Sequence, residues 1–445
     1  MWTALPSFRQ TRSPQRMLKP HAQLWSQPMT LRPMRTVLLL AWTSAWSFLI
    51  AACCVNPPTG SSYLGVNGPQ RGITNAYDLA QEAGLKWANI SIRWNDLEPC
   101  QGCYQWTTPI CPNSSSCPIT RTFCAPCSSA GSSSSCWDGT SACSSLDDQI
   151  DQAFSRTTPM GIKVVISGTP VWAQRTNLRR QDGCHNNDDP AAPPTDPSFY
   201  GNFVAAVADR YRAKIAIFEL WGEPNDPDFW RGTARDYRDY ILAPGYDAVA
   251  THGCGVPQTK VFAPYYALWE QSPPYDISDV SRFIRQCKDP NTGSTSDTTC
   301  RSNADCTSPE KCRLVRNIDA LSFDTNRDVS TDQAMMDAVN TWMNTTGDAP
   351  GWYSVSEFGF TSDATTSTCS DCSQVISGAP GQDYVTIMNK CYGNNDCLWA
   401  FADYLTDRWR CVCPTGAVTC NLGLLDRDGT PRGKYYTIKD TFAGY

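Results

Sequence analysis

Short apolar, β-prone runs alternate with amphipathic helical segments along residues 62–404, and this alternation constrains the fold more than any other feature. The eight runs that predict strands lie at 62–67, 87–94, 162–168, 217–221, 260–265, 318–324, 352–360 and 397–404. Segments with helical periodicity separate them, at 75–83, 146–156, 199–211, 233–250 (interrupted at 244–245), 277–286, 332–344 and 383–390. Strands that alternate with helices form parallel sheets, and eight such strands can close into a barrel. The sequence therefore predicts an α/β fold, a (β/α)8 TIM barrel.

Two polar, cysteine-rich segments fall between the strands, at 100–143 and 287–312. The chain contains 23 Cys, far more than a protein of the reducing cytosol uses. We predict that both segments are surface insertions closed by local disulfides. Half of a zinc site at Cys124 and Cys127 is the alternative, but no second pair stands at zinc-finger spacing, so we expect no metal.

The first 53 residues have the composition of a leader. They contain six Lys or Arg and no acidic residue, and Val37–Ala52 is an apolar run of 16 residues, shorter than the roughly 20 of a membrane span. This pattern predicts a secretory signal, with an organelle transit peptide as the alternative. Because Ile50–Cys53 resembles a bacterial lipobox, a lipid anchor on Cys53 is a further expectation, and residues 54–445 would form the mature barrel. We expect a secreted or cell-surface monomer.

Charge and histidine content exclude several classes of function. The net charge is −6, and the rest of the chain is still more acidic because the leader is basic. An acidic chain disfavours nucleic acid and anionic membranes as partners. With only three His in the chain, histidine-rich metal sites and Ser-His-Asp triads are poor candidates, so we expect chemistry by carboxylates and no cofactor.

Two glutamates follow predicted strands. Ile217–Trp221 runs into Gly222-Glu223-Pro224, where Pro224 ends the strand and favours an extended Glu223. The run Trp352–Phe360 repeats this pattern with Glu357. Counted from residue 62, these are strands four and seven, and barrel enzymes hold their catalytic groups at the C-terminal ends of strands. A pair of carboxyl groups at one end of a barrel is suited to cleaving a glycosidic bond.

At this point the chain resembles a known group of enzymes. The run Trp221–Asn225, followed by Phe229 and Trp230, is similar to the W-N-E-P-N…F-W signature of clan A glycoside hydrolases. Within that clan it looks closest to the family 39 β-xylosidases and α-iduronidases. The resemblance implies a (β/α)8 barrel that hydrolyses with retention, with Glu223 as acid/base and Glu357 as nucleophile.

The resemblance and the composition also suggest residues that bind a poly- or oligosaccharide. Arg93 follows strand two and Trp399 lies on strand eight, as the family pattern has them, and flat aromatic rings stack on pyranose rings. For each of these residues, core packing, a buried ion pair or a role in a turn is the alternative. The candidate substrate-binding residues are Asn67, Arg93, Trp172, Trp221, Asn225, Trp230, Asn326 and Trp399.

The sequence departs from the family pattern in two places. Gly222 stands where the family has an Asn that binds a sugar hydroxyl, and strand six offers Asp324 to Arg327 in place of His-x-Tyr. We expect either that a neighbour such as Asn225 or Asn326 takes over the sugar contact, or that the site accepts a bulkier substrate. The alternative to a retaining glycosidase is a carbohydrate-binding surface barrel without catalysis. Sugar, linkage, exo or endo action, disulfide connectivity and the start codon are left open by the sequence.

Overall fold

The computed structural model describes residues 64–67, 75–108, 144–155, 159–181, 187–254, 259–268, 276–325, 329–359, 381–402, 410–413, 416–419, 424–425 and 430–443. The predictions for the leader 1–53 with Cys53, for the cysteines of 109–143 and for Asn326 lie outside these residues. Each helix among the described residues is too short or too polar to cross a lipid bilayer.

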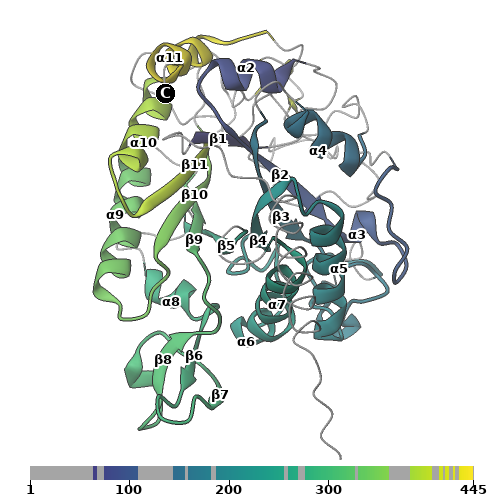
Figure 1. Cartoon of the computed structure of the whole chain (residues 1–445), viewed down its shortest axis with the longest axis vertical. Coiled ribbons are helices and arrows are strands. Elements are labelled where there is room, and N and C mark those ends of the chain that lie inside the picture. Colours follow the sequence, from purple (N-terminus) through teal and green to yellow (C-terminus); the bar gives the residue numbers. More distant parts are fainter. Residues whose placement is uncertain are drawn as a thin grey trace, which may run out of the picture. The chain divides into compact units, whose positions relative to one another are not determined.

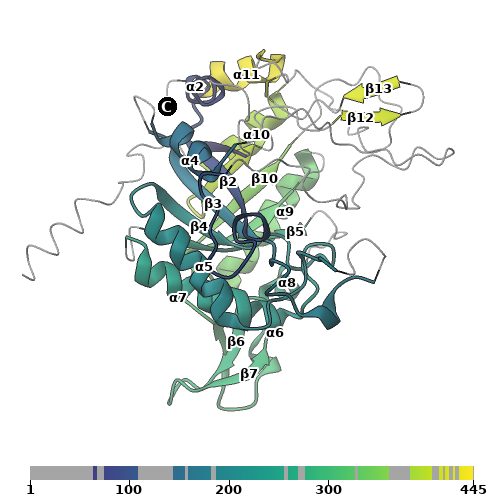
Figure 2. The ribbon, with the colours of Figure 1, turned by 90° about the vertical axis from the view of Figure 1, so that its right-hand side faces the viewer.

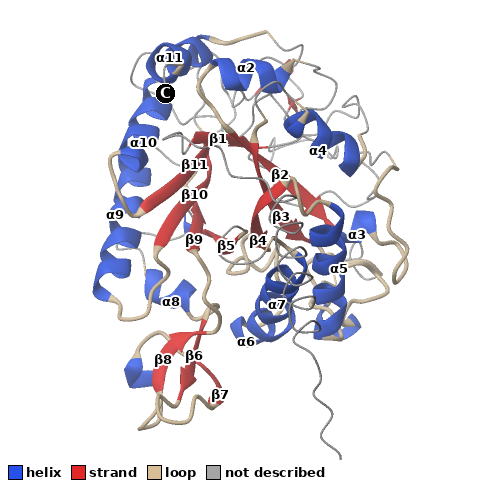
Figure 3. Cartoon of the chain, viewed as in Figure 1, coloured by secondary structure: helices blue, strands red, loops and turns tan. Residues whose placement is uncertain are grey.

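Eight parallel strands close into a barrel (Figure 3). Their order around the barrel is β1–β2–β3–β4–β5–β9–β10–β11, so consecutive barrel strands are neighbours, and β9, β10 and β11 are the sixth, seventh and eighth. The bounds are Leu64–Asn67 (β1), Trp87–Arg93 (β2), Gly161–Ser167 (β3), Ile215–Leu220 (β4), Lys260–Ala267 (β5), Ala320–Asp324 (β9), Trp352–Phe358 (β10) and Cys397–Ala402 (β11). Every predicted strand overlaps one of them, which confirms the (β/α)8 fold.

Helices pack around the barrel wall (Figures 1 and 2). The longer ones are Leu146–Phe154 (α4), Pro197–Arg210 (α5), Ala243–His252 (α7), Val329–Thr345 (α9), Gln382–Tyr392 (α10) and Gly433–Phe442 (α11). The shorter ones are Ala76–Glu82 (α2), Trp94–Leu97 (α3), Thr176–Leu178 (η1), Ala234–Tyr237 (α6), Arg238–Leu242 (η2), Ile277–Ser281 (α8) and Asn303–Asp305 (η4). In α5, Asp196 accepts a hydrogen bond from the Ser198 N–H and Pro197 occupies the first turn, the usual start of a helix.

The predicted break at Pro244 is absorbed within a continuous helical segment. Pro244 has no N–H for a helical hydrogen bond, and it lies at the start of α7, directly after a π-helical turn. The π-helical turn η2 connects α6 directly to α7. The path from Ala234 to His252 therefore remains helical.

The N-terminal half of the barrel interior is filled by apolar side chains. This cluster contains Trp87, Ala216, Ile217, Phe262, Ala320, Trp399 and Phe401. Trp399 packs edge-on against Trp87, with ring centroids 5.2 Å apart. Among the described residues this packing fills the N-terminal end of the barrel, which leaves the C-terminal ends of the strands for polar groups.

The second insertion is a small antiparallel sheet rather than a loop. It consists of Arg285–Lys288 (β6), Thr295–Thr299 (β7) and Lys311–Leu314 (β8), in the order β7–β6–β8. The helix predicted at 277–286 is accordingly wrong beyond Ser281, because the chain enters β6 at Arg285. Strand β7 consists of polar residues only, without apolar periodicity, and therefore was not predicted from the sequence.

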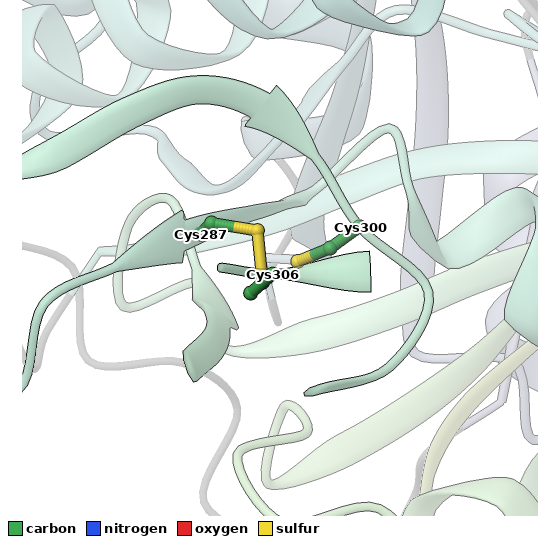
Figure 4. A group of neighbouring side chains, drawn as sticks. All are labelled: Cys287, Cys300 and Cys306. Atoms are coloured by element: carbon green, nitrogen blue, oxygen red, sulfur yellow. A yellow bond between two sulfur atoms is a disulfide. The ribbon is translucent and has the colours of Figure 1, made fainter. Parts of the chain in front are cut away.

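Disulfides close this small sheet, as predicted. Cys287 is bonded to Cys306 and Cys300 to Cys312, with Cα atoms 5.5 and 5.8 Å apart. Figure 4 shows Cys287, Cys300 and Cys306 together, a grouping whose sulfur atoms are close enough for a metal site. Since all three sulfurs are in disulfides, they offer no thiolate to a metal. In the first insertion, the described bond is Cys100–Cys103.

A C-terminal pair of strands and a C-terminal helix were not predicted. Arg410–Cys413 (β12) pairs antiparallel with Gly416–Thr419 (β13). Helix α11 buries Tyr435, Ile438 and Phe442 and contacts α10. The spacing of these three residues is helical and could have indicated α11.

A further disulfide, Cys391–Cys397, links the end of α10 to β11.

Candidate active site

The turn after β4 holds Glu223 in an unusual backbone conformation. Trp221 has φ 83° and Glu223 has φ 47°, both in the left-handed region that non-glycine residues rarely adopt. The prediction that Pro224 would keep Glu223 extended is therefore wrong. The Trp221 N–H donates to the Ile166 carbonyl (3.0 Å) and the Glu223 N–H to the Tyr265 carbonyl (2.7 Å). These bonds to β3 and β5 hold the strained turn, and strain of this kind is common at active sites.

An irregularity in β10 places Glu357. The register between β10 and β9 shifts between Val355 and Glu357, where Glu357 pairs with Asp324 of β9. Such a bulge changes the direction of the side chains that follow it. Glu357 is half-buried, and it lies on the seventh strand of the barrel, as predicted.

Asp324, at the end of β9, is a third carboxyl group between the two glutamates. Its side chain is buried (1% exposed) and forms a hydrogen bond with Glu223. Burial raises the pKa of Asp324 well above its usual value, and the charges of Glu357 and Glu223 raise it further. The raised pKa favours the protonated form of Asp324, which is the form that can donate this hydrogen bond to Glu223. Its place at the end of a predicted strand was visible in the sequence, but its role was not predicted.

Tyr265 of β5 reaches the same group of carboxyls. Its ring lies against Gly222, where an added Cβ would come within 2.4 Å of the ring carbon Cζ. Burial raises the pKa of Tyr265 well above its usual value, followed by the charges of Glu357, Asp324 and Glu223. Tyr265 thus stays protonated as a hydrogen-bond donor beside three carboxyl groups. Nothing in the local sequence distinguished it from its neighbour Tyr266.

A polar layer lies inside the barrel between the apolar cluster and the carboxyl groups. Lys163 donates to Glu219 (2.8 Å) and to the Ser356 hydroxyl (2.9 Å), which in turn donates to Glu219 (2.8 Å). Asn67 donates to the Ser356 carbonyl (2.9 Å) and accepts from Asn89 (2.6 Å). Asn67, predicted to bind substrate, is therefore part of this buried network. Ser356 directly precedes Glu357, so the layer also fixes the backbone that carries this glutamate.

The tryptophans predicted to bind sugar are mostly buried. Trp221, Trp230 and Trp399 are 1%, 2% and 6% exposed, respectively. Trp221 packs on Trp230 with ring centroids 5.1 Å apart, and Trp399 belongs to the apolar cluster of the barrel. Trp172 is half-buried and donates its indole N–H to the Glu98 carbonyl (2.8 Å). In this structure all four rings pack in or against the core.

Arg93 and Asn225 each have a partner within the protein. The Arg93 guanidinium pairs with Asp96 (3.2 Å). The Asn225 side chain donates to the Ala267 carbonyl (3.2 Å) and accepts from the Ala267 N–H (3.0 Å). Because its amide clamps the loop after β4 to β5, Asn225 is poorly placed to replace the sugar contact missing at Gly222.

A cavity of about 400 Å³ lies beside the same loop. Its lining includes Pro224 and Asn225 from the loop, Trp230, and Arg282 and Phe283 from the segment before β6. Its volume is within the range of small-molecule sites. The loop that carries Glu223 therefore borders a cavity as well as the barrel.

No protein-family model and no curated protein matches this chain. Similar solved structures include a family 39 glycoside hydrolase from Bacteroides cellulosilyticus WH2, with 12% identity over 87% of this chain and 64% of that chain, and a TM-score of 0.46. The GH53 catalytic domain of Ignisphaera aggregans has 12% identity over 87% of this chain and 99% of its own, with a TM-score of 0.46. The exo-β-1,4-mannosidase Op5Man5 from Opitutaceae bacterium strain TAV5 has 12% identity over 88% of this chain and 61% of its own, with a TM-score of 0.47.

The chain thus spans less than two thirds of the length of two of these three proteins. They belong to different groups of hydrolases, and all three are about equally similar to this chain. At 12% identity they do not single out a family for it.

Proposed function

We propose that this protein is a retaining glycoside hydrolase that cleaves O-glycosidic bonds in a poly- or oligosaccharide. The observation that supports the proposal is the placement of Glu223 and Glu357 at the C-terminal ends of barrel strands four and seven. Both carboxyl groups act on Asp324 and on Tyr265, so they face a common region. Two carboxyl groups around one site are the machinery that glycoside hydrolysis requires.

In the first step of the proposed reaction, Glu223 gives its proton to the glycosidic oxygen as the bond from that oxygen to the anomeric carbon breaks. The Glu357 carboxylate attacks the anomeric carbon and forms a covalent glycosyl ester. Glu223 is left as a carboxylate. The protonated Asp324 carboxyl donates a hydrogen bond to Glu223 and thereby stabilises the charge formed there.

In the second step, the Glu223 carboxylate takes a proton from water, and the water oxygen displaces Glu357 from the anomeric carbon. The sugar leaves with its original configuration, because two inversions have occurred. Glu357 is again a carboxylate and Glu223 again an acid, so the cycle closes without a cofactor.

We also propose that the enzyme acts outside the reducing cytosol. The disulfides Cys100–Cys103, Cys287–Cys306, Cys300–Cys312 and Cys391–Cys397 support this, since such bonds persist in oxidising compartments.

The test begins with a panel of aryl β-glycosides and polysaccharides, followed by variants on the best substrate. Glu357→Ala should abolish turnover of every substrate, because no covalent intermediate can form. Glu223→Ala should still release an activated aryl group while nearly stopping turnover of an unactivated oligosaccharide. Azide should then rescue Glu223→Ala and give a glycosyl azide of retained configuration, because a small anion needs no base.

Glu310→Ala is the matched control, since Glu310 lies in the small disulfide-closed insertion and should tolerate the change with full activity. The opposite pattern, with azide rescue of Glu357→Ala, would reverse the two roles. Wild-type activity in both variants would rule out these carboxyl groups as the catalysts. Binding of an oligosaccharide without turnover would support the alternative, a carbohydrate-binding barrel.

A further inference from the structure

The Tyr265 ring occupies the space that a side chain at position 222 would need. An added Cβ at Gly222 would lie 2.4, 2.5 and 2.6 Å from the Cζ, hydroxyl oxygen and Cε1 of Tyr265, closer than such atoms can approach. The φ angle of Gly222 is not in the left-handed region, so steric contact rather than backbone conformation requires the glycine. The side chain that the family signature has before its acid/base is thus excluded here by a tyrosine ring from the next strand.

The backbone around Tyr265 holds the ring in this position. Gly222 and Tyr265 form a parallel bridge, and the Tyr265 carbonyl accepts from the Glu223 N–H (2.7 Å). The register of β5 against β9 shifts between Phe262 and Tyr265. Tyr265 is therefore aligned by the same contacts that position Glu223.

The Tyr265 hydroxyl is available to a ligand. The residue is half-buried, and no hydrogen bond joins its hydroxyl to another described residue. The carboxyl groups of Glu357, Asp324 and Glu223 all act on it electrostatically. A phenol in such surroundings keeps its proton, so it offers one O–H donor next to groups that accept protons.

We propose that Tyr265 binds a hydroxyl of the sugar ring held between Glu223 and Glu357, in place of the side chain missing at Gly222. This inference rests on the proposed hydrolase function. A sugar hydroxyl fits the surroundings, because it can accept from Tyr265 and donate to a neighbouring carboxylate at once. A carboxylate on the sugar at this point would be repelled by the Glu357 carboxylate, so the bound ring carries a neutral hydroxyl there.

Tyr265→Phe tests the contact, because it removes only the hydroxyl and leaves the ring against Gly222. On the best aryl glycoside, kcat/KM should fall about 10- to 100-fold, the loss expected for one hydrogen bond to substrate. Among the monodeoxy versions of that substrate, one should lose no further activity in the variant, since it already lacks the partner hydroxyl. A merely structural role for Tyr265 would lower activity equally on all of them.

Tyr266→Phe is the matched control. The Tyr266 hydroxyl is buried without a hydrogen-bond partner among the described residues, and its ring packs on Phe283. The same substitution at this neighbouring position should leave kcat/KM unchanged. Thermal unfolding of both variants separates lost folding from lost binding.

A swap tests the shared space. Gly222→Asn alone should be almost inactive, because the Asn side chain collides with the Tyr265 ring. Adding Tyr265→Ala should restore activity at least tenfold over Gly222→Asn, since the ring no longer blocks the Asn. A double variant no better than Gly222→Asn would overturn the inference.

The outcomes separate this inference from the proposed function. Full activity of Tyr265→Phe, or an equal loss on every deoxy substrate, would overturn the inference while leaving the hydrolase proposal intact if Glu357→Ala is inactive. Activity of Glu357→Ala equal to the wild type would overturn the hydrolase proposal. A wild type that neither hydrolyses nor binds any member of the panel would overturn both.

Discussion

The buried Lys163–Glu219 pair permits a quantitative prediction. Both side chains are fully buried, and the Lys163 ammonium contacts Glu219 (2.8 Å), the Ser356 hydroxyl (2.9 Å) and the Phe401 ring, 4.3 Å from its centroid. Lys163→Met leaves the Glu219 charge buried without its cation. Removing one partner of such a pair costs about 3–5 kcal/mol. This is a large part of the roughly 5–15 kcal/mol that stabilises a typical protein.

The double variant Lys163→Met with Glu219→Leu removes both charges and fills the space with apolar atoms. We expect it to lie within about 1 kcal/mol of the wild type, because replacing a whole buried pair is often neutral. The coupling energy of the double-mutant cycle is then at least about 2 kcal/mol. Urea unfolding followed by tryptophan fluorescence measures the free energy of unfolding of the wild type and of each variant.

Lys260→Met is the control for this cycle. Lys260 forms an ion pair with Asp319 at 2.8 Å, but the two side chains are 23% and 13% exposed. Solvent screens such a pair, so we expect a loss of less than about 1 kcal/mol. The reasoning is refuted if Lys163→Met is no more destabilising than Lys260→Met. It is also refuted if the loss in the double variant equals the sum of the losses in Lys163→Met and Glu219→Leu.

Three further predictions concern other parts of the chain. Because burial raises the pKa of Asp324, its protonated form stabilises the fold below about pH 4, and this contribution is lost as the pH rises through the folded-state pKa. The urea midpoint of Asp324→Asn should therefore fall less between pH 4 and 8 than that of the wild type. An equal fall of the two midpoints would contradict this. Gly222→Ala should cost about 1–3 kcal/mol in urea unfolding, since its Cβ would overlap the Tyr265 ring, and an unchanged midpoint would show that the ring moves freely. Replacing Cys287 and Cys306 by Ser opens a loop with a sequence separation of 19 and should lower the stability of the insertion by about 3 kcal/mol. The rate at which a protease cleaves the insertion measures this loss. A variant as resistant as the wild type would show that the disulfide does not stabilise the insertion.

The barrel and the positions of its two glutamates could be predicted because they depend on local patterns. Each barrel strand is a short apolar run, and each run is separated from the next by a helical segment, so order and direction follow from the chain alone. Counting strands then assigned Glu223 and Glu357 to strands four and seven, where the structure has them. Whether the aromatic residues nearby were exposed could not be predicted, since Trp221 and Trp399 differ from sugar-binding tryptophans only in what packs on them.

Local rules failed where long-range contacts overrode them. A residue before proline prefers an extended backbone, but Glu223 has φ 47° because its N–H is held by the Tyr265 carbonyl. The segment after Ser281 has residues compatible with a helix, but pairing with β8 makes it a strand from Arg285 onward. In both cases hydrogen bonds to a distant part of the chain decided between two locally acceptable conformations.

The amino-acid sequence by itself determined the barrel and the disulfide-closed insertion at residues 287–312. It also determined which two carboxyl groups follow strands four and seven. It also showed that Gly222 stands where the signature that the chain resembles has a side chain, but left the consequence open. Only the tertiary structure showed that Tyr265 fills that space and that Asp324 shares a hydrogen bond with Glu223. The physical reason is that strand periodicity is encoded between near neighbours in the chain. Which side chains meet at the end of a barrel depends on the register of its strands and on the bulges that redirect them.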